Sequence, residues 1–417
     1  MSLRGVSISQ GAIGINVAGD NREFGLILNG VNIADKLQYD RAYRLRRIQD
    51  AESIGITPEY DQTHNIHVYR HIAEFYRIAG AGRVLNILIV DQQTTIKDMI
   101  SSAKLLVVES DGNISDMAFA SNLADDYLET TINGLSNVVY EAVPVLQEFA
   151  NWCGDQDKPL HITLEGRAVS DTLSGLMDLR NFEITIEGEA VKLEANKVSM
   201  VIAQDYSHAK NFTGSSQKMA DVGTFLGIIA RAPWNRNPGE VQTGNIQNVP
   251  LNTWLIGGLS NHQRYSDVYE SLETLNDKGY IIPVKYQGMA GYWFNDGPVC
   301  APIVIDNQGN INAHTIYYSH TLDQCIRGLR LVYLPEIKKP VPLDNGKLPT
   351  DMIAYYNAIG DRFFGQLESA GLISQGQTMV DPDSDLLREK VLRVQFSVIP
   401  TGTISEIIGA INLKTNF

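Results

Sequence analysis

An alternation of helical and apolar segments in the first third of the chain places the strongest limit on its fold. Residues 66–78 carry apolar side chains at three- and four-residue spacings, which is typical of an amphipathic helix. The run 84–90 that follows is almost entirely apolar, as expected of a strand covered by helices on both faces. A helix at about 95–105 and a second apolar run at 105–108 continue the pattern. This order predicts βαβ units and therefore an α/β fold with a mostly parallel or mixed sheet.

Helical and strand-like segments continue through the middle of the chain. A longer helix is expected at 136–152, where Pro144 should kink or divide it. The segment 232–250 is rich in proline and asparagine and lacks periodicity, which predicts a long ordered loop. The other expected elements are strands at 161–164, 182–186, 198–203 and 280–285 and helices at 217–230 and 267–276.

The last quarter of the chain has a different pattern, and we place a domain boundary near Asn310. After it come a helix at 322–331, a proline-rich connector and a helix at 352–372, which Gly371 is placed to end. Two closing strands follow, at about 392–398 and 404–413. The expected organisation is an N-terminal arm (1–25), an α/β domain (26–310), a C-terminal α+β domain (311–403) and a C-terminal arm (404–417).

Both ends of the chain carry apolar residues at alternate positions, as strands do. The N-terminal set is Val6, Ile8, Ile13, Ile15 and Val17, and the C-terminal set is Ile407, Ile411 and Leu413. The N-terminal segment is either an extended arm or a first core strand. A lone terminal strand cannot bury its apolar stripe unless a sheet edge receives it. That edge belongs either to a neighbouring subunit, which we favour, or to the strand's own subunit.

Composition excludes several classes of function. A chain of 417 residues is expected to form two or three structural units. Its 48 acidic and 34 basic residues give a net charge of −14, which disfavours nucleic acid or a membrane as the main partner. The three cysteines (Cys153, Cys300 and Cys325) are far apart and are expected to be reduced, buried thiols of a cytoplasmic protein. No segment has the pattern of a secretory signal or a membrane span.

Two short motifs suggest chemistry but lack a required part. The glycines of Gly80-Ala81-Gly82 precede an expected strand, whereas a dinucleotide-binding loop follows one, so a plain turn is the better interpretation. His67 and His71 have the spacing of two metal ligands on a helix, with His64 nearby. A metalloprotease helix would also need a glutamate between them, and the intervening residues are Val-Tyr-Arg. Hydrogen-bonded or solvated histidines are therefore expected.

The remaining acidic and nucleophilic residues predict no active site. Asp381, Asp383 and Asp385 alternate like the first ligands of a calcium loop, but Leu386 and Leu392 occupy the positions that require glycine and glutamate. An acidic turn leading into a helix is expected instead. No GxSxG motif or distinctive carboxylate pair is found. We therefore expect no catalytic, cofactor or metal site, although a soluble α/β enzyme with a site assembled from distant residues stays an alternative.

The order of elements in the second half resembles the contractile tail sheath proteins of phages, R-type pyocins and contractile injection systems. The segments that carry the resemblance span about residues 214–413. They are MADVGTFLGIIARAPWNRNPGE, GYWFNDGPVCAP, TLDQCIRGLRLVYL, MIAYYNAIGDRFFGQLESAGLI, DPDSD, VLRVQFSVIP and IIGAINL. One departure is that Arg327 and Arg330 replace the double arginine that many sheath proteins have there, so an intersubunit salt bridge from that pair is not expected.

The resemblance implies a structural subunit that polymerises as a helical cylinder around an inner tube and contracts without a nucleotide. Residues 311–403 would then be an assembly domain, and both termini would add strands to sheets of neighbouring subunits. The implied partners are further copies of the chain, the inner tube protein, and baseplate and terminator or cap proteins, with assembly in a bacterial cytoplasm. Another tail or baseplate component of the same kind of particle is the first alternative.

Overall fold

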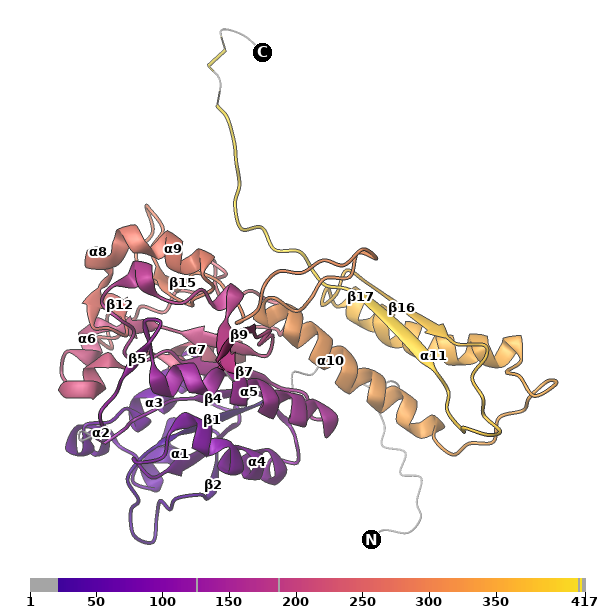
Figure 1. Ribbon diagram of the computed structural model, residues 1–417, viewed down its shortest axis with the longest axis horizontal. Helices are drawn as coiled ribbons and strands as arrows, with labels where there is room; N and C mark the ends of the chain where they lie inside the picture. Colours follow the sequence, from indigo (N-terminus) through magenta and orange to yellow (C-terminus); the bar gives the residue numbers. More distant parts are fainter. Residues whose placement is uncertain (1–21, 125–126, 187, 412, 415–417) are drawn as a thin grey trace. The chain divides into compact units, whose positions relative to one another are not determined.

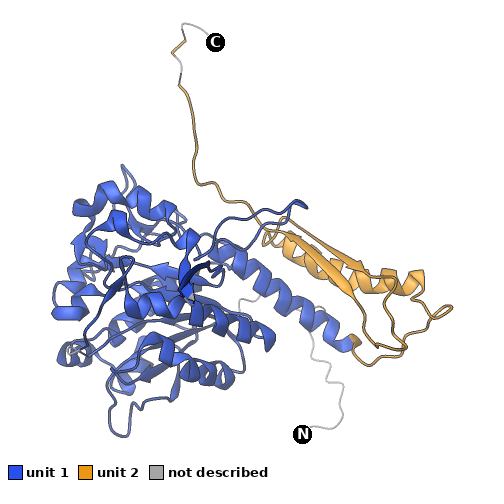
Figure 2. Ribbon diagram, in the orientation of Figure 1, with its two compact units in different colours: residues 1–335 blue, residues 336–417 orange. Residues whose placement is uncertain are grey.

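The computed structural model describes residues 22–124, 127–186, 188–411 and 413–414. The chain forms two compact units, Met1–Pro335 and Glu336–Phe417 (Figure 2). Residues 1–21 of the expected N-terminal arm, with Val6, Ile8, Ile13, Ile15 and Val17, lie outside the described residues, whereas residues 23–25 belong to the first strand of the large sheet. The first unit contains the large sheet that the sequence predicts, and the second is built around one long helix.

A six-stranded sheet forms the centre of the first unit (Figure 1). Its strand order is β10-β7-β4-β1-β3-β2, with all neighbours parallel except the edge strand β2, which is antiparallel to β3. The strands are β1 (Glu23–Asn29), β2 (Ala42–Leu45), β3 (Leu85–Val90), β4 (Ile114–Phe119), β7 (His161–Glu165) and β10 (Val198–Val201). The prediction of a mostly parallel sheet is thus confirmed, and β1 is a central strand that the sequence analysis did not place.

Helices cover both faces of this sheet because its strands are apolar on both sides. Along β1, Ile27 belongs to one buried cluster while Leu26 and Leu28 belong to the other. The first cluster includes side chains of α4 (Ile100–Glu109) and α5 (Asn137–Asp155), and the second includes side chains of α3 (Val68–Ala79) and α7 (Val222–Arg231). Such two-sided burial is what parallel sheets require.

A glycine lets α3 and α7 pack closely. A Cβ atom on Gly223 would lie 2.2 Å from the carbonyl oxygen of His71, so any larger residue would force the two helices apart. On the other face of the sheet, α5 runs through Pro144 as a single helix, and the division expected there is not found. The carbonyl of Tyr140, four residues before Pro144, loses its helical N–H donor, but tertiary packing of the buried face maintains the helix.

The remaining elements of the first unit are short, apart from one helix. This helix, α10 (Ile316–Tyr333), covers the expected helix at 322–331 and extends it in both directions. The short helices are α1 (Ile48–Ser53), α2 (Pro58–His64), α6 (Tyr206–Ala209), α8 (Tyr265–Val268) and α9 (Leu272–Asp277). The 3-10 turns are η1 (Ile96–Met99), η2 (Leu173–Gly175), η3 (Leu179–Asn181), η4 (Gly214–Lys218) and η5 (Tyr269–Ser271), with η6 (Leu334–Glu336) at the junction of the units. The short strands are β5 (Thr131–Ile132), β6 (Leu135–Ser136), β8 (Glu183–Ile186), β9 (Glu189–Lys192), β11 (Ala203–Asp205), β12 (Gly257–Leu259), β13 (Gln263–Arg264), β14 (Pro283–Val284) and β15 (Trp293–Phe294).

The second unit consists of α11 (Thr350–Ser369), β16 (Gln375–Val380) and β17 (Val394–Ile399). The two strands form an antiparallel sheet in which Thr378 is opposite Phe396. α11 packs on one face of this sheet, and its Phe363, Phe364 and Leu367 are buried. The helix and β17 agree with the sequence analysis, whereas β16 was not expected.

Two expectations are wrong in detail, and a third stays a prediction. The run 105–108 is the last part of α4 and not a strand, because Leu106 and Val107 are buried while Leu105 and Val108 are exposed, a one-sided pattern that a helix produces. The helix expected at 267–276 is divided into α8, η5 and α9. The last closing strand, which we expect to pair with a neighbouring subunit, has no counterpart among the described residues, where 400–411 follow β17 without secondary structure.

Candidate functional site

The C-terminal segment after β17 is the most exposed apolar part of the described chain. Ile404, Ile407, Ile408, Ile411 and Leu413 expose 79–100% of their surface. A stripe of this kind is costly to leave in water, at roughly 1.5–3 kcal/mol for each large aliphatic side chain. The three residues predicted as C-terminal contacts, Ile407, Ile411 and Leu413, are therefore together in one segment that is available to another surface.

The β16–β17 sheet has only two strands, so each strand is also an edge of the sheet. A Cβ atom on Gly376 would lie 2.3 Å from the ring of Phe364, so glycine is needed for α11 to approach the sheet. Phe396 of β17 contacts the same ring, with centroids 6.4 Å apart. The opposite face of the sheet carries Met379 and Ile399, each 56% exposed. A two-stranded sheet is only marginally stable alone, so α11 and any added strand both contribute to its stability.

Side chains of α11 occupy one of these edges. The N–H groups of Gly376, Thr378 and Val380 donate to Glu368 Oε1, Asp361 Oδ1 and Asn357 Oδ1 at 2.7, 2.9 and 2.9 Å. These N–H groups alternate along β16 with those that face β17. The edge of β16 is therefore already hydrogen-bonded to the helix of its own unit.

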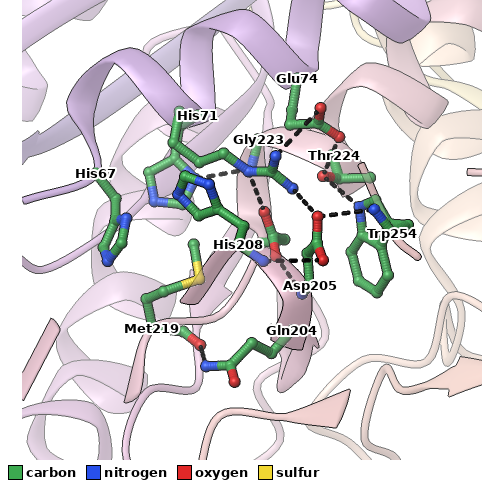
Figure 3. A network of polar contacts seen from close by, with 12 residues as sticks. His67, His71, Glu74, Gln204, Asp205, His208, Met219, Gly223, Thr224 and Trp254 are labelled. Carbon is green, nitrogen blue, oxygen red and sulfur yellow. Dashed lines mark hydrogen bonds and ion pairs between the residues drawn. The ribbon is translucent and has the colours of Figure 1, made fainter. Parts of the chain in front are cut away.

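A buried network of charges joins α3, α7 and β11 in the first unit. Arg70 of α3 lies 2.9 Å from Asp221, 3.1 Å from Asp205 and 3.5 Å from Glu74. Figure 3 shows this network, in which Thr224 of α7 donates to Glu74 and the main-chain N–H of Trp254 donates to Asp205. Each of the four charged side chains exposes less than a tenth of its surface.

The charges of this network stabilise one another. Burial lowers the pKa of Arg70, but Asp221, Glu74 and Asp205 outweigh it, so the pKa of the guanidinium is raised. Burial raises the pKa of Asp221 to about 6, against the opposing effect of Arg70. Removing one member of a buried network of this kind leaves an uncompensated charge, which is strongly destabilising. The network therefore fixes the packing of α3 against α7.

The histidines of the suggested metal motif are part of the same region. His67 and His71 are buried, and His67 Nε2 lies 2.7 Å from the carbonyl oxygen of Ser216. His71 Nδ1 accepts from the main-chain N–H of Gly223, at 3.4 Å. His64 packs its ring against Tyr60. Among the described residues, no three His, Cys, Asp or Glu side chains are arranged to hold a metal ion.

A groove of about 770 Å³ runs along α3 and is lined by side chains of α1, α2 and α3, including Arg70 and Glu74. Its other lining residues are Arg47, Ala81, His208, Asn211, Phe212, Leu251 and Thr253. The glycine-rich turn lies at its border, but the N–H groups of both glycines are engaged. Gly80 N–H donates to the carbonyl of Tyr76 and Gly82 N–H to that of Arg46. A phosphate cradle needs free N–H groups, so the turn is structural, as the sequence analysis expected.

A cluster of histidine, serine and aspartate beneath α10 looks like a catalytic set but has the wrong hydrogen bonds. His161 Nε2 lies 2.9 Å from Ser199 Oγ, yet the single hydroxyl hydrogen of Ser199 is donated to the carbonyl of Pro298 at 2.7 Å. His161 must therefore donate to Ser199 and cannot accept its proton. Asp116 pairs with His320 instead of His161. All these side chains are buried, so the cluster does not form a nucleophile and base in the sense of a hydrolase.

The same cluster anchors α10 to the sheet. Lys197, next to β10, pairs with Asp323, and His320 pairs with Asp116 of β4. Arg327 donates to the carbonyls of Gly112, Ile114 and Pro159 at 2.8, 2.9 and 2.7 Å. Arg330 pairs with Asp157 at 2.9 Å. The two arginines that replace the double arginine of sheath proteins are thus bonded within their own unit.

The cysteines and the acidic turn have structural surroundings. Cys153, Cys300 and Cys325 are free and buried, as expected, and burial raises the pKa of each thiol to about 12. The segment 381–385 forms turns in which Asp381 accepts from the N–H of Asp383 and Asp385 from that of Arg388. The helix start expected after it is not formed. None of the helices in the described part of the chain is both long and apolar enough to span a bilayer.

The chain matches one family of known sequence. Residues 5–298 match the family model described as DUF2586, N-terminal domain. The chain belongs to the DUF2586 family. No curated protein matches this DUF2586 protein at a significant level.

Solved structures match the DUF2586 protein over almost its whole length. A chain of the anti-feeding prophage baseplate matches with a TM-score of 0.59 and 10% identity, and the alignment covers 100% of both chains. The anti-feeding prophage helical sheath in its contracted state gives 0.58 and 10%, covering 99% of each. The sheath tail protein of Desulfitobacterium hafniense gives 0.54 and 8%, covering 95% of this chain and 100% of the other. The DUF2586 protein therefore has the fold of contractile sheath proteins.

Proposed function

We propose that this DUF2586 protein is a structural subunit of a contractile tail sheath, which polymerises as a helical cylinder around an inner tube and contracts to drive the tube through a target envelope. The observation that carries the proposal is the full-length match to sheath proteins, which covers the second unit as well as the α/β unit. The particle would be a phage tail or a phage-tail-like particle assembled in a bacterial cytoplasm. Its other partners would be baseplate and terminator or cap proteins.

The exposed C-terminal segment supports polymerisation through strand addition. Its apolar side chains are 79–100% exposed, so contact with a second copy would remove them from water. At about 25 cal/mol per Å² of buried apolar surface, five aliphatic side chains supply a substantial part of one intersubunit contact. A segment that leaves one subunit and joins the sheet of the next makes a head-to-tail contact, which need not close and therefore propagates as a helix.

The β16–β17 sheet supplies a suitable acceptor for such a strand. It has only two strands, and one more antiparallel or parallel neighbour would add main-chain hydrogen bonds along its full length. We assign residues 311–403 to an assembly domain that contains this acceptor and whose helix α10 is bonded to the α/β domain at 26–310. The arms are at 404–417 and at 1–25, of which residues 23–25 already pair in β1. The alternating residues Val6, Ile8, Ile13, Ile15 and Val17 give the N-terminal arm the same capacity to pair.

Contraction in this proposal needs no bound nucleotide, because its free energy is stored in lattice contacts at assembly. The rigid α/β unit fits this role: its buried charge network and the anchoring of α10 hold it as one body while the contacts made by the arms change. The polar clusters described above serve packing, which supports a structural and not an enzymatic role.

Electron microscopy of the purified full-length protein, alone and with its inner tube protein, tests the proposal. Hollow cylinders are expected at sufficient concentration. Protein that stays monomeric with both termini intact and the tube present would overturn it.

The alternative is a structural component at the baseplate end of the same kind of particle, and one of the matching structures is described as a baseplate. A baseplate component would form rings or bind a baseplate partner without growing into long cylinders. The length distribution of the assemblies in the same micrographs separates the two.

A further inference from the structure

The two long edges of the β16–β17 sheet differ in how their main-chain groups are bonded. On the β16 side, Glu368, Asp361 and Asn357 accept from three alternate N–H groups, at 2.7–2.9 Å. All three acceptors come from α11, at spacings of four and seven residues, which place them on one face of the helix. A sheet edge in water needs no such arrangement, because water can satisfy its N–H groups.

The pairing register defines which groups point away from β16 on the other strand. Asp381 N–H donates to the carbonyl of Arg393, so the hydrogen-bonded pairs of the ladder fall on every second residue from Arg393 onward. The main-chain groups of Val394 and Val398 are therefore directed away from β16. No side chain of α11 among the described residues accepts from the N–H groups of these two valines.

We infer that Asn357, Asp361 and Glu368 close the β16 edge against strand addition, so that an incoming strand can pair only along β17. An added strand at β16 would have to displace three hydrogen bonds, two of them to carboxylates, and would bring its own carbonyls toward those anions. At Val394 and Val398 of β17 the same strand displaces no side-chain acceptor of α11 among the described residues. The three residues therefore set the direction of assembly, in the way that natural sheets protect edges that must not pair.

The occupant of the β17 edge is the segment 404–413 of a second copy, whose apolar side chains are exposed in the isolated chain. This inference rests on the proposed sheath function. It adds that the β16–β17 sheet of each subunit accepts the C-terminal segment of a neighbour along one edge only.

Two matched proline variants of the full-length chain test the direction. Val380 and Val394 are paired directly across the sheet. Val394→Pro removes an N–H from the β17 edge, and Val380→Pro removes one from the edge that Asn357 occupies. Loss of one main-chain hydrogen bond per contact should raise the concentration needed for polymerisation about tenfold for Val394→Pro. Val380→Pro should leave that concentration within about twofold of wild type.

A third variant opens the closed edge. The triple substitution Asn357→Ala, Asp361→Ala and Glu368→Ala should convert regular cylinders into irregular, laterally joined polymers, because a second edge becomes available. Adding Ile407→Asn and Ile411→Asn to the triple variant should suppress these polymers, since the same segment supplies the added strand.

The outcomes distinguish this inference from the proposed function. Absence of any polymer of the wild type would overturn the proposed function. Wild-type cylinders together with equal effects of the two proline variants, or with regular cylinders of the triple variant, would overturn only the edge assignment. If a proline variant loses its cooperative melt, amide hydrogen exchange of the wild type tests the edge assignment instead. The amides of Thr378 and Val380 should be protected before assembly, and those of Val394 and Val398 should gain protection only on polymerisation. The reverse pattern would overturn the inference.

Discussion

Several buried histidines of the first unit are held in their uncharged form. His67 is the simplest case, because burial lowers the pKa of its imidazole to about 3, with a further contribution from Arg70 and Arg167. The nearby His71 and His208 also have a lowered pKa, mainly through burial. Each of these rings is neutral in the folded protein at pH 7, whereas the same side chain in an unfolded chain takes up a proton below about pH 6.5.

This difference predicts that the first unit loses stability in acid. The folded pKa of His67 is depressed, so its contribution is complete at neutral pH and is lost as the pH falls from about 6.5 toward 3. At pH 5 the loss from His67 alone is about 2 kcal/mol. His67→Gln keeps an N–H for the Ser216 carbonyl and should reduce the difference in unfolding free energy between pH 7 and pH 5 by about that amount.

Denaturant unfolding at the two pH values measures this effect. His64→Gln is the matched control, since His64 is a partly exposed histidine at the end of α2. An equal pH dependence in wild type and His67→Gln would show that the buried imidazole does not control acid stability.

At the scale of elements, α10 is held by polar anchors as well as by buried apolar side chains such as Ile316, Cys325 and Leu329. Its residues Leu322 and Ile326 are 40% and 51% exposed, while Ser319, His320 and Asp323 are buried against the sheet. Arg327 bridges three main-chain carbonyls near the starts of β4 and β7. The position of the helix is therefore fixed by directed hydrogen bonds, which tolerate little displacement.

Removal of Arg327 should destabilise the first unit. In Arg327→Ala the three carbonyls lose a charged donor, and we expect the unfolding free energy to fall by about 3 kcal/mol. Arg330→Ala is the matched control on the same helix, because Arg330 and Asp157 are both half exposed and such a pair contributes at most about 1 kcal/mol. Thermal melts of the two variants provide the measurement. Similar losses in both would mean that packing and not the carbonyl bridge holds α10.

The sequence predicts those elements whose burial is decided by periodicity. The run 84–90 is apolar on both faces, and α11 has one apolar face, so both elements can be recognised from the sequence. The run 105–108 is too short to distinguish a helix from a strand by its composition, and β16 is hidden because its sequence, QGQTMV, is mostly polar. Its strand conformation comes from pairing with β17 and from the α11 side chains that accept hydrogen bonds from its N–H groups. Both are tertiary contacts.

For the polar sites too, the sequence shows the spacing of nearby residues but not the contacts made by distant ones. The spacing of His67 and His71 is visible in the sequence, but their neutral, buried state depends on Ser216 and Gly223, about 150 residues away. The network of Arg70 likewise draws on Asp205 and Asp221 from another part of the chain. Asn357 and Asp361 do share one face of a helix in the sequence. Nothing in the sequence indicates that this face lies against a strand edge.

At the scale of the whole molecule, the chain combines an α/β unit that has a large buried core with a C-terminal segment whose apolar side chains are exposed. A terminal strand that completed its own sheet would be buried there, as ordinary terminal strands are. Here the segment from Ile404 to Leu413 forms no strand within the described chain and leaves its isoleucines in water. The folded state of one subunit is therefore expected to be independent of this segment, while the contact between subunits depends on it.

Deletion of residues 404–417 tests this separation directly. We expect the truncated protein to keep the thermal midpoint of the wild-type monomer within about 2 °C, since the removed apolar side chains are almost fully exposed and contribute little to folding. Polymerisation should be lost, because the intersubunit strand is gone.

A milder variant is Ile407→Asp with Ile411→Asp in the full-length chain. It keeps the backbone of the segment but places charges where apolar contacts are expected. Loss of apolar burial alone should weaken its assembly at least tenfold. Sedimentation and a thermal melt on the same samples separate the two roles. A truncated protein that aggregates without a cooperative melt would mean that the segment is an internal strand of its own subunit, whereas a folded truncated protein that still forms cylinders would mean that subunits are joined elsewhere.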